Sequence, residues 1–170
     1  MTSRLGRWIQ DRPRLLEWSY RVTAGALQIV HPAIGWIGYE RLNSIFESAE
    51  KITKRPVFDC RMCGMCSLHS TGMTCPMTCP KEMRNGPCGG VRPDGRCEVN
   101  PEMDCVWVMS WRRAADMQDY GDQIMHLQPP VDYKLQGSSA WLNQLRGRDR
   151  VDPEGWLRSG PVVEEASIVR

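Results

Sequence analysis

All eight cysteines of this 170-residue chain lie between positions 60 and 105. They are Cys60, Cys63, Cys66, Cys75, Cys79, Cys88, Cys97 and Cys105. The same stretch has a Gly or Pro every few residues, which excludes long helices and regular strands. Apart from Cys and Met it carries few apolar side chains, so burial alone does little to offset the entropy of ordering it. The sequence therefore predicts that bound metal folds residues 57–105.

Disulfides, structural zinc and iron–sulfur clusters are the three explanations for so many thiols. The N-terminus has no apolar segment typical of a secretory signal, so we expect a cytoplasmic protein, and disulfides are disfavoured there. Eight thiolates divide evenly into two four-cysteine sites, which would hold two 4Fe–4S clusters or two zinc ions. The run Cys60-x2-Cys63-x2-Cys66 has the spacing of bacterial ferredoxins. Such a run suits a cubane cluster better than one tetrahedral zinc, so we favour two 4Fe–4S clusters and keep two Zn as the alternative.

The pattern departs from ferredoxin after Cys66, because eight residues rather than three separate it from Cys75. His69 lies in that interval and could replace a thiolate, although with eight cysteines available we expect a surface loop histidine. The methionines of the stretch are expected to fill gaps around the clusters. The glycine-rich segment near Cys88 matches neither a P-loop nor a dinucleotide fingerprint. No catalytic residue is therefore predicted in this chain.

Composition divides the chain into a helical N-terminal segment (1–56), a cysteine-rich metal-binding domain (57–111) and a helical or extended C-terminal segment (112–170). The predicted fold is mainly α with a loop-rich, metal-stabilised cysteine domain, flanking helices on both sides and little regular strand. Pro13 predicts a helix start, and we expect that helix to end near Val30, at His31–Pro32. Further helices are predicted over 34–54, from Val106 and over the segment that Gly147 ends.

The predicted helix over 34–54 has two faces by its periodicity. The apolar face would consist of Ile34, Gly38, Leu42, Ile45, Ala49 and Ile52. The opposite face would consist of Glu40, Arg41, Glu47, Glu50, Lys51 and Lys54. We expect the polar face to be solvated and to carry no site. The apolar stretch 22–39 contains Gln28, His31 and Pro32, so no membrane span is predicted.

The seven tryptophans all lie outside the cysteine stretch, in both flanks. Because Trp is enriched among the anchor residues of protein interfaces, this distribution predicts a chain that docks on a partner. Core packing is the competing explanation for these rings. The formal net charge of +2 gives no electrostatic footprint for nucleic acid.

The stretch CGMCSLHSTGMTCPMTCPKEMRNGPCGG, continued by RPDGRCEVNPEMDCVW, resembles the cysteine-rich C-terminal domain of methylenetetrahydrofolate reductases. The resemblance covers about residues 60–111 and includes every cysteine of the chain. The same stretch is similar to the small iron–sulfur subunit of two-subunit methylenetetrahydrofolate reductases. The resemblance implies that all eight cysteines are cluster ligands.

The resemblance also implies a partner, a flavin-bearing TIM-barrel reductase subunit of one-carbon (folate) metabolism. FAD or FMN would be bound only by that partner, since this chain has no motif for a barrel. The chain would then be an accessory electron-transfer subunit of an oxidoreductase, exchanging electrons with a further redox partner. A zinc-binding structural or adaptor subunit of the same complex is the alternative, and a thiolate-zinc site that handles methyl groups is a weaker one.

Overall fold

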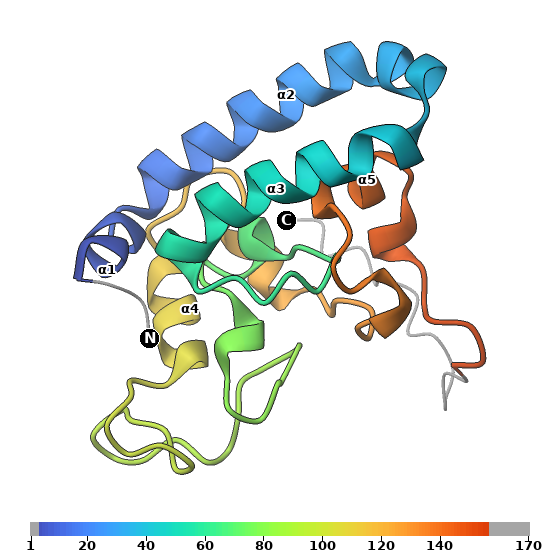
Figure 1. The fold of residues 1–170 in the computed structure, drawn as a ribbon. Coiled ribbons are helices and arrows are strands. Elements are labelled where there is room, and N and C mark those ends of the chain that lie inside the picture. Colours follow the sequence, from blue (N-terminus) through green and yellow to red (C-terminus); the bar gives the residue numbers. More distant parts are fainter. Residues whose placement is uncertain (1–3, 157–170) are drawn as a thin grey trace, which may run out of the picture.

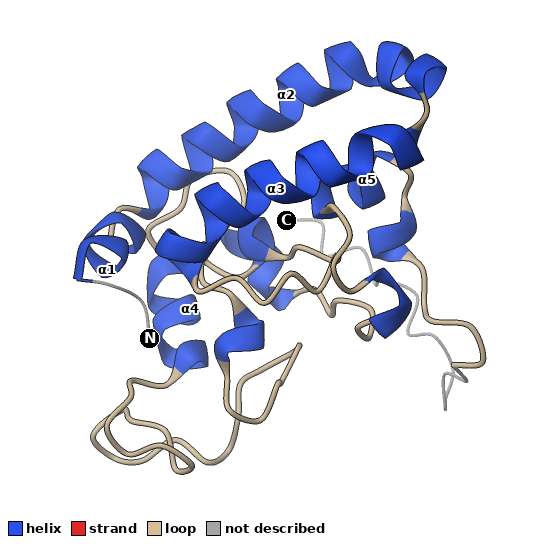
Figure 2. Cartoon of the chain, viewed as in Figure 1, coloured by secondary structure: helices blue, strands red, loops and turns tan. Residues whose placement is uncertain are grey.

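The computed structural model describes residues 4–156, and helices dominate it (Figures 1 and 2). The α-helices are α1 (Arg4–Gln10), α2 (Pro13–Ile37), α3 (Tyr39–Phe58), α4 (Val106–Ala114) and α5 (Ala140–Leu145). Strand pairing within the described residues is limited to two isolated bridges, Val91 with Cys97 and Arg96 with Asp104. The prediction of a mainly helical, loop-rich fold with little strand is confirmed.

Helices α2 and α3 form an antiparallel hairpin along one side of the molecule (Figure 1). The predicted start at Pro13 is confirmed, but the predicted break at His31–Pro32 is wrong, because α2 continues through Pro32 to Ile37. Pro32 removes one backbone donor, and the long helix tolerates that loss. The chain turns instead at Gly38, whose φ of 102° is readily accessible only to glycine.

The predicted faces of α3 are reversed in part. Ile45 and Ile52 were expected in the core, yet they are 65% and 75% exposed. Glu50 and Lys54 were expected in solvent, yet they are only 4% and 9% exposed. The reason is that this polar face of α3 lies against the cysteine stretch. Glu50 and Lys54 pair with each other there, and Glu50 also accepts a hydrogen bond from Ser139. Periodicity identifies two faces but does not state which one is covered.

Buried polar side chains join the N-terminal helices to the rest of the fold. Glu17 of α2 accepts backbone N–H bonds from three successive residues, Gln118, Asp119 and Tyr120, at 2.8–2.9 Å. Arg113 of α4 donates to Gln10, Asp11 and Thr74.

Leu68, Met73 and Met117 form a small apolar core beside these contacts. The helix predicted from Val106 is confirmed but ends at Ala114, and α5 ends just before Gly147 as expected. The mixed charge, Pro and Gly of the tail from Val151 predict disorder or an extended arm, and its residues from 157 onward lie outside the described residues.

Candidate metal centre

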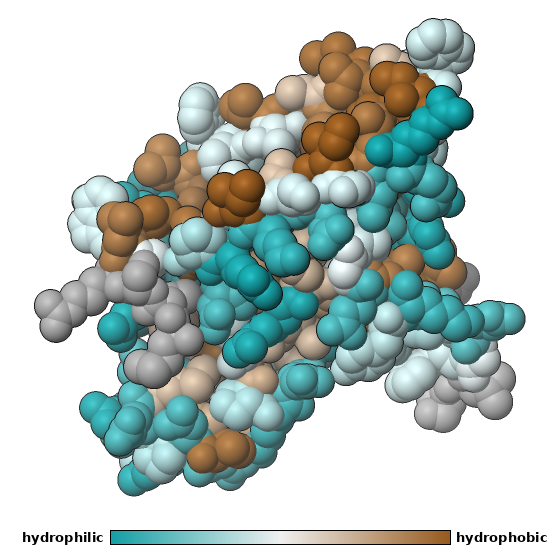
Figure 3. Space-filling model, viewed as in Figure 1, coloured by the Kyte–Doolittle hydropathy of each residue, from teal (hydrophilic) through white to brown (hydrophobic). Residues whose placement is uncertain are grey.

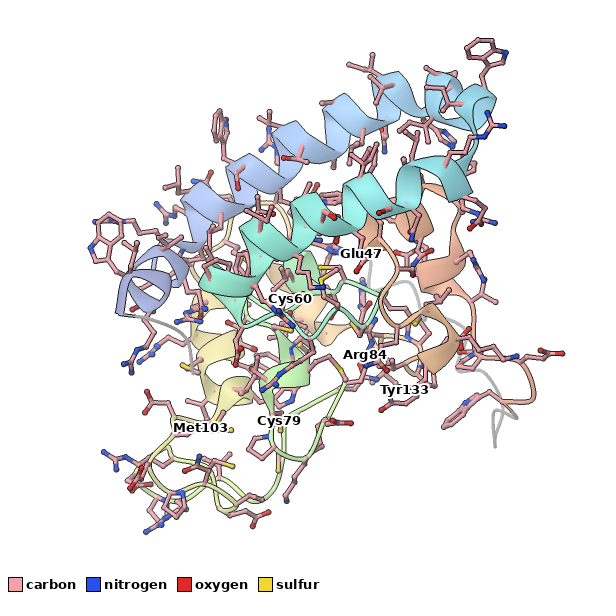
Figure 4. All side chains as sticks on the ribbon, in the orientation of Figure 1. Glu47, Cys60, Cys79, Arg84, Met103 and Tyr133 are labelled. Atoms are coloured by element: carbon pink, nitrogen blue, oxygen red, sulfur yellow. The ribbon has the colours of Figure 1, made fainter. Side chains whose placement is uncertain are left out.

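Four of the predicted ligands meet at one place below α3. Cys60, Cys63, Cys66 and Cys75 all line a single cavity, which Glu50 and Lys54 of α3 also line. Figure 4 shows Cys60 on the side of α3 that faces away from α2. The four thiols are separated by short loops in the sequence, and only the fold around them brings Cys75 to the Cys60–Cys66 run.

Tight backbone turns aim these thiols inward. Asp59 caps helix α3 in the left-handed region, with φ 50°, and Met62 (φ 52°) and Gly64 (φ 76°) also have positive φ. The turn allows the Met62 N–H to donate to Cys60 Sγ at 3.4 Å. Gly64 is needed for a second reason, since a Cβ there would lie 2.2 Å from the Leu135 carbonyl oxygen. The C-terminal segment therefore packs directly on the turn between the ligands.

The thiols of this site influence one another. Burial, together with the neighbouring Cys66 and Cys63, raises the pKa of Cys60 to about 11, although the Met62 N–H and Lys54 act in the opposite direction. Burial also raises the pKa of Cys75, and Cys60, Cys66 and Cys63 act in the same direction. Without metal, the Cys60 and Cys75 thiols are therefore neutral. Because thiolates are what metals bind, metal loading of such a site must release protons.

The other four cysteines, Cys79, Cys88, Cys97 and Cys105, belong to the turn-rich part below α4. The Cys97 N–H donates to the Met103 carbonyl and the Cys105 N–H donates to the Gly95 carbonyl, both at 3.0 Å. This antiparallel pairing puts Cys97 and Cys105 on the same face of a short ribbon, in diagonal positions. Cys79, Cys97 and Cys105 are buried. The Gly90 N–H donates to Cys88 Sγ at 3.4 Å.

A wider cleft of about 640 Å³ separates the two groups of cysteines, and Cys63, Cys75 and Cys79 line it. Cys75 and Cys79 flank a single 3₁₀ turn, Pro76–Thr78. The two groups are therefore joined covalently through one turn of backbone. Met103 lies on the same cleft, and Figure 4 shows it with Cys79 on the side of the molecule away from α2.

His69 is not the surface loop histidine that was expected. Its ring stacks on Tyr20 at 5.0 Å between centroids and meets Tyr120 edge-on. Burial lowers the pKa of His69 to about 4, and Arg150 and Arg84 add to the effect. It does not line the four-cysteine cavity, whereas Met62, Met65 and Met77 do. These three methionines therefore lie beside the cysteines of the cavity, and their packing around clusters stays a prediction.

Sequence reasoning missed the charged residues of this cavity. Lys54 Nζ lies 2.6 Å from Glu50 Oε2, and the Arg84 guanidinium donates to the Met65 carbonyl at 2.7 Å. Arg84 lies near the labelled Cys60 in Figure 4. The i, i+4 spacing of Glu50 and Lys54 predicts an ion pair on a helix, but it does not predict that the pair is buried. No local pattern distinguishes Arg84 from a surface arginine.

The cavity offers four thiols as donors, those of Cys60, Cys63, Cys66 and Cys75. Among the described residues, no group of three His, Cys, Asp or Glu side chains is placed to hold one metal ion. Four thiols nevertheless share one cavity. In a 4Fe–4S cluster each thiolate binds a different iron, whereas four thiolates on zinc must all approach one centre to about 2.3 Å.

Comparison with known families gives one match, over residues 39–134, to the family described as methylene-tetrahydrofolate reductase C terminal. The sequence has no significant match among curated proteins or solved structures. Among the helices of residues 4–156, none has the length and hydropathy needed to cross a bilayer. The matched residues contain all eight cysteines, α3 and α4, and cover more than half of the chain. The chain therefore belongs to the methylene-tetrahydrofolate reductase C-terminal family.

Proposed function

We propose that this chain is an iron–sulfur electron-transfer subunit that carries two 4Fe–4S clusters and works with a flavin-dependent methylenetetrahydrofolate reductase subunit. The observation that carries the proposal is the common cavity of Cys60, Cys63, Cys66 and Cys75. A cubane needs four thiolates at one place, with three supplied by a C-x2-C-x2-C run and one by a later segment. Family membership supports the reductase complex as the setting.

The ligand pairing follows from this cavity. Cys60, Cys63, Cys66 and Cys75 would hold the first cluster, and the remaining cysteines, Cys79, Cys88, Cys97 and Cys105, would hold the second. The diagonal placement of Cys97 and Cys105 supports their belonging together. The turn from Cys75 to Cys79 would keep the clusters close, which efficient electron transfer requires. Bound clusters would supply one-electron chemistry, which the side chains of this protein do not provide by themselves.

The chain's own residues would position and insulate these groups. Met62, Met65 and Met77 are buried around the first site and exclude water from it. The N–H groups of Met62 and Gly90 donate to cysteine sulfurs, and such hydrogen bonds help to set a cluster's reduction potential. The segment 130–140 closes the first site through Leu135, which packs on Gly64.

The helical hairpin is the surface that we assign to the flavin-bearing subunit. Trp18, Ile29 and Trp36 of α2 are 59%, 81% and 90% exposed, and Figure 3 shows apolar residues gathered along this helix and its turn into α3. Residues 22–37 contain no Asp, Glu, Lys or Arg, although most of them are exposed. A continuous apolar patch of this kind is typical of an interaction site. Trp141 is not part of it, since its ring stacks on Tyr20.

Anaerobic purification followed by metal analysis tests the proposal. We expect about eight iron and about eight sulfide per chain, together with co-purification of a flavoprotein reductase from native cells. The variants Cys66→Ser and Cys97→Ser should each lose about half of the iron, because they belong to different sites. A colourless protein with about two zinc per chain would refute the clusters and favour the zinc-binding adaptor. Recovery of the chain alone, without flavoprotein, would contradict the subunit role.

A further inference from the structure

The cavity of Cys60, Cys63, Cys66 and Cys75 is flanked by buried positive charge. Arg84 is 8% exposed and lines the cavity on one side. Lys54 is 9% exposed and lines it on the other. Charged side chains are rarely buried to this degree unless a partner compensates them. The partners of these two cations therefore indicate what the cavity is built to hold.

Arg84 has only neutral hydrogen-bond partners among the described residues. Its Nη1 donates to the Met65 carbonyl at 2.7 Å and to Ser67 Oγ at 3.4 Å, and its Nε donates to the Pro129 carbonyl at 3.2 Å. No carboxylate of the described residues lies within ion-pair distance of it. Burial works against its charge, while Cys63, Cys66 and Cys75 favour it. The guanidinium is thus held beside the thiols by neutral hydrogen-bond partners, and the buried carboxylate of Asp149 favours its charge without forming an ion pair with it.

Lys54 differs from Arg84 because it has a counter-ion. Glu50 Oε2 lies 2.6 Å from its Nζ. The other oxygen of Glu50 accepts from Ser139 Oγ at 2.5 Å and from the Trp141 N–H at 3.1 Å. These bonds fix Glu50, which in turn fixes the ammonium group near Cys66 and Cys60. The pair adds little net charge, and both of its members line the cavity.

The charges near the second group of cysteines are solvent-exposed. Lys81 Nζ lies 3.6 Å from Cys88 Sγ, but the Lys81 side chain is 37% exposed and pairs with Glu98. Exposed pairs contribute little because water screens them, whereas a buried charge acts through a medium of low dielectric constant. The two groups of cysteines therefore lie in different electrostatic environments.

We propose that Arg84 is a positioning residue that stabilises the more negative, reduced form of the cluster at Cys60, Cys63, Cys66 and Cys75. Reduction adds one electron and one negative charge to this group without making or breaking a bond. Arg84 lowers the free energy of that added charge, so this site has the higher reduction potential of the two. Electrons entering at Cys79, Cys88, Cys97 and Cys105 would therefore collect at the Arg84 site. This inference rests on the proposed function.

Three variants test it, and two of them, Arg84→Met and Glu50→Gln, have opposite expected signs. Arg84→Met removes the positive charge, while Arg84→Lys retains it. Glu50→Gln removes the counter-ion of Lys54 and keeps acceptors for Ser139 and Trp141. The purified protein is titrated with dithionite and each cluster is followed by electron paramagnetic resonance. We expect Arg84→Met to shift the oxidised-to-reduced ratio of one cluster at least tenfold, about 59 mV downward for a one-electron couple. Arg84→Lys should shift it less, and Glu50→Gln should shift it upward.

Lys81→Met is the matched control, because it removes an exposed cation beside a cysteine of the other group. Lys81→Met should leave the higher of the two reduction potentials unchanged. Unchanged potentials in both Arg84→Met and Glu50→Gln would overturn the inference. If Arg84→Met fails to take up iron, the inference is tested by Glu50→Gln alone. A reduction potential that falls or stays unchanged in Glu50→Gln overturns the inference. An iron-free wild-type protein would instead refute the proposed function itself.

Discussion

Arg113 and Asp11 are 102 residues apart in sequence, yet Arg113 Nη2 lies 2.7 Å from Asp11 Oδ1. The same guanidinium donates to Gln10 Oε1 at 2.7 Å and to Thr74 Oγ1 at 2.9 Å. Its side chain is 5% exposed, whereas that of Asp11 is 60% exposed. One buried arginine therefore joins the α1–α2 connection, the cysteine stretch beside Cys75 and helix α4.

We predict that Arg113→Ala destabilises the protein strongly. Removing the guanidinium leaves Gln10 Oε1 and Thr74 Oγ1 buried without this donor, at about 1–3 kcal/mol each. The melting temperature should fall by at least about 4 °C, since ~1 kcal/mol corresponds to ~2–4 °C at this size. Asp11→Asn is the control and should cost less than ~1 kcal/mol, because Asp11 is exposed. Equal losses in the two variants would contradict this ranking.

Gly64→Ala should damage the first cysteine site. The new Cβ would lie 2.2 Å from the Leu135 carbonyl oxygen, and its backbone would be held at φ 76°. Steric crowding of this kind costs typically ~1–3 kcal/mol. Iron content and melting temperature should both fall. Gly89→Ala is the matched control beside Cys88, since nothing lies within 4 Å of its added Cβ. Full iron content in Gly64→Ala would count against tight packing there.

Removal of metal is expected to unfold residues 57–105, whose apolar side chains are too few to order them. Arg61, Lys81 and Arg96 are exposed in this stretch and are sites for trypsin. Chelation under anaerobic conditions should make these sites sensitive to cleavage, while the loaded protein resists it. Persistent protection after chelation would mean that another source of stability exists.

Trp36→Ala should weaken association with the flavin-bearing subunit. The Trp36 side chain is 90% exposed at the end of α2, and an interface anchor contributes ~2 kcal/mol or more. That corresponds to about a 30-fold higher Kd, measured by titration of one purified subunit with the other. Leu127→Ala is the control, because Leu127 is 84% exposed but lies outside the hairpin. The cluster absorbance should stay unchanged in both variants, and equal affinities would place the interface elsewhere.

Acid should destabilise the fold through His69. Burial lowers the pKa of His69 from 6.5 to about 4, so the unfolded state takes up this proton first as the pH falls. Stability linked to His69 is therefore present above pH ~6.5 and is lost progressively toward pH ~4. His69→Phe keeps a ring against Tyr20 and should show a smaller drop in melting temperature between pH 7 and pH 5. His126→Phe, at an exposed histidine, should behave like wild type.

The cysteine pattern by itself determined much of this protein's character. The spacing Cys60-x2-Cys63-x2-Cys66 and the density of Gly and Pro predicted a turn-rich, ligand-bearing centre between helices, and the residue order carried the family. These features are local, because ligand spacing and backbone breakers act within a few residues. The placement of Pro13 and Gly147 at helix boundaries was predictable for the same reason.

Only the tertiary structure decided which face of α3 is buried. Glu50 and Lys54 resemble a solvated surface pair in sequence, and Ile45 and Ile52 resemble core residues. The fold reverses this order because Glu50 and Lys54 pair with each other beside the cysteine cavity, where Glu50 also accepts from the buried Ser139. Contacts between distant segments, such as that of Glu50 with Ser139, leave no periodic signal in either segment. Desolvation and pairing of charge are properties of the assembled site, so the sequence names the ligands while the fold sets their electrostatic environment.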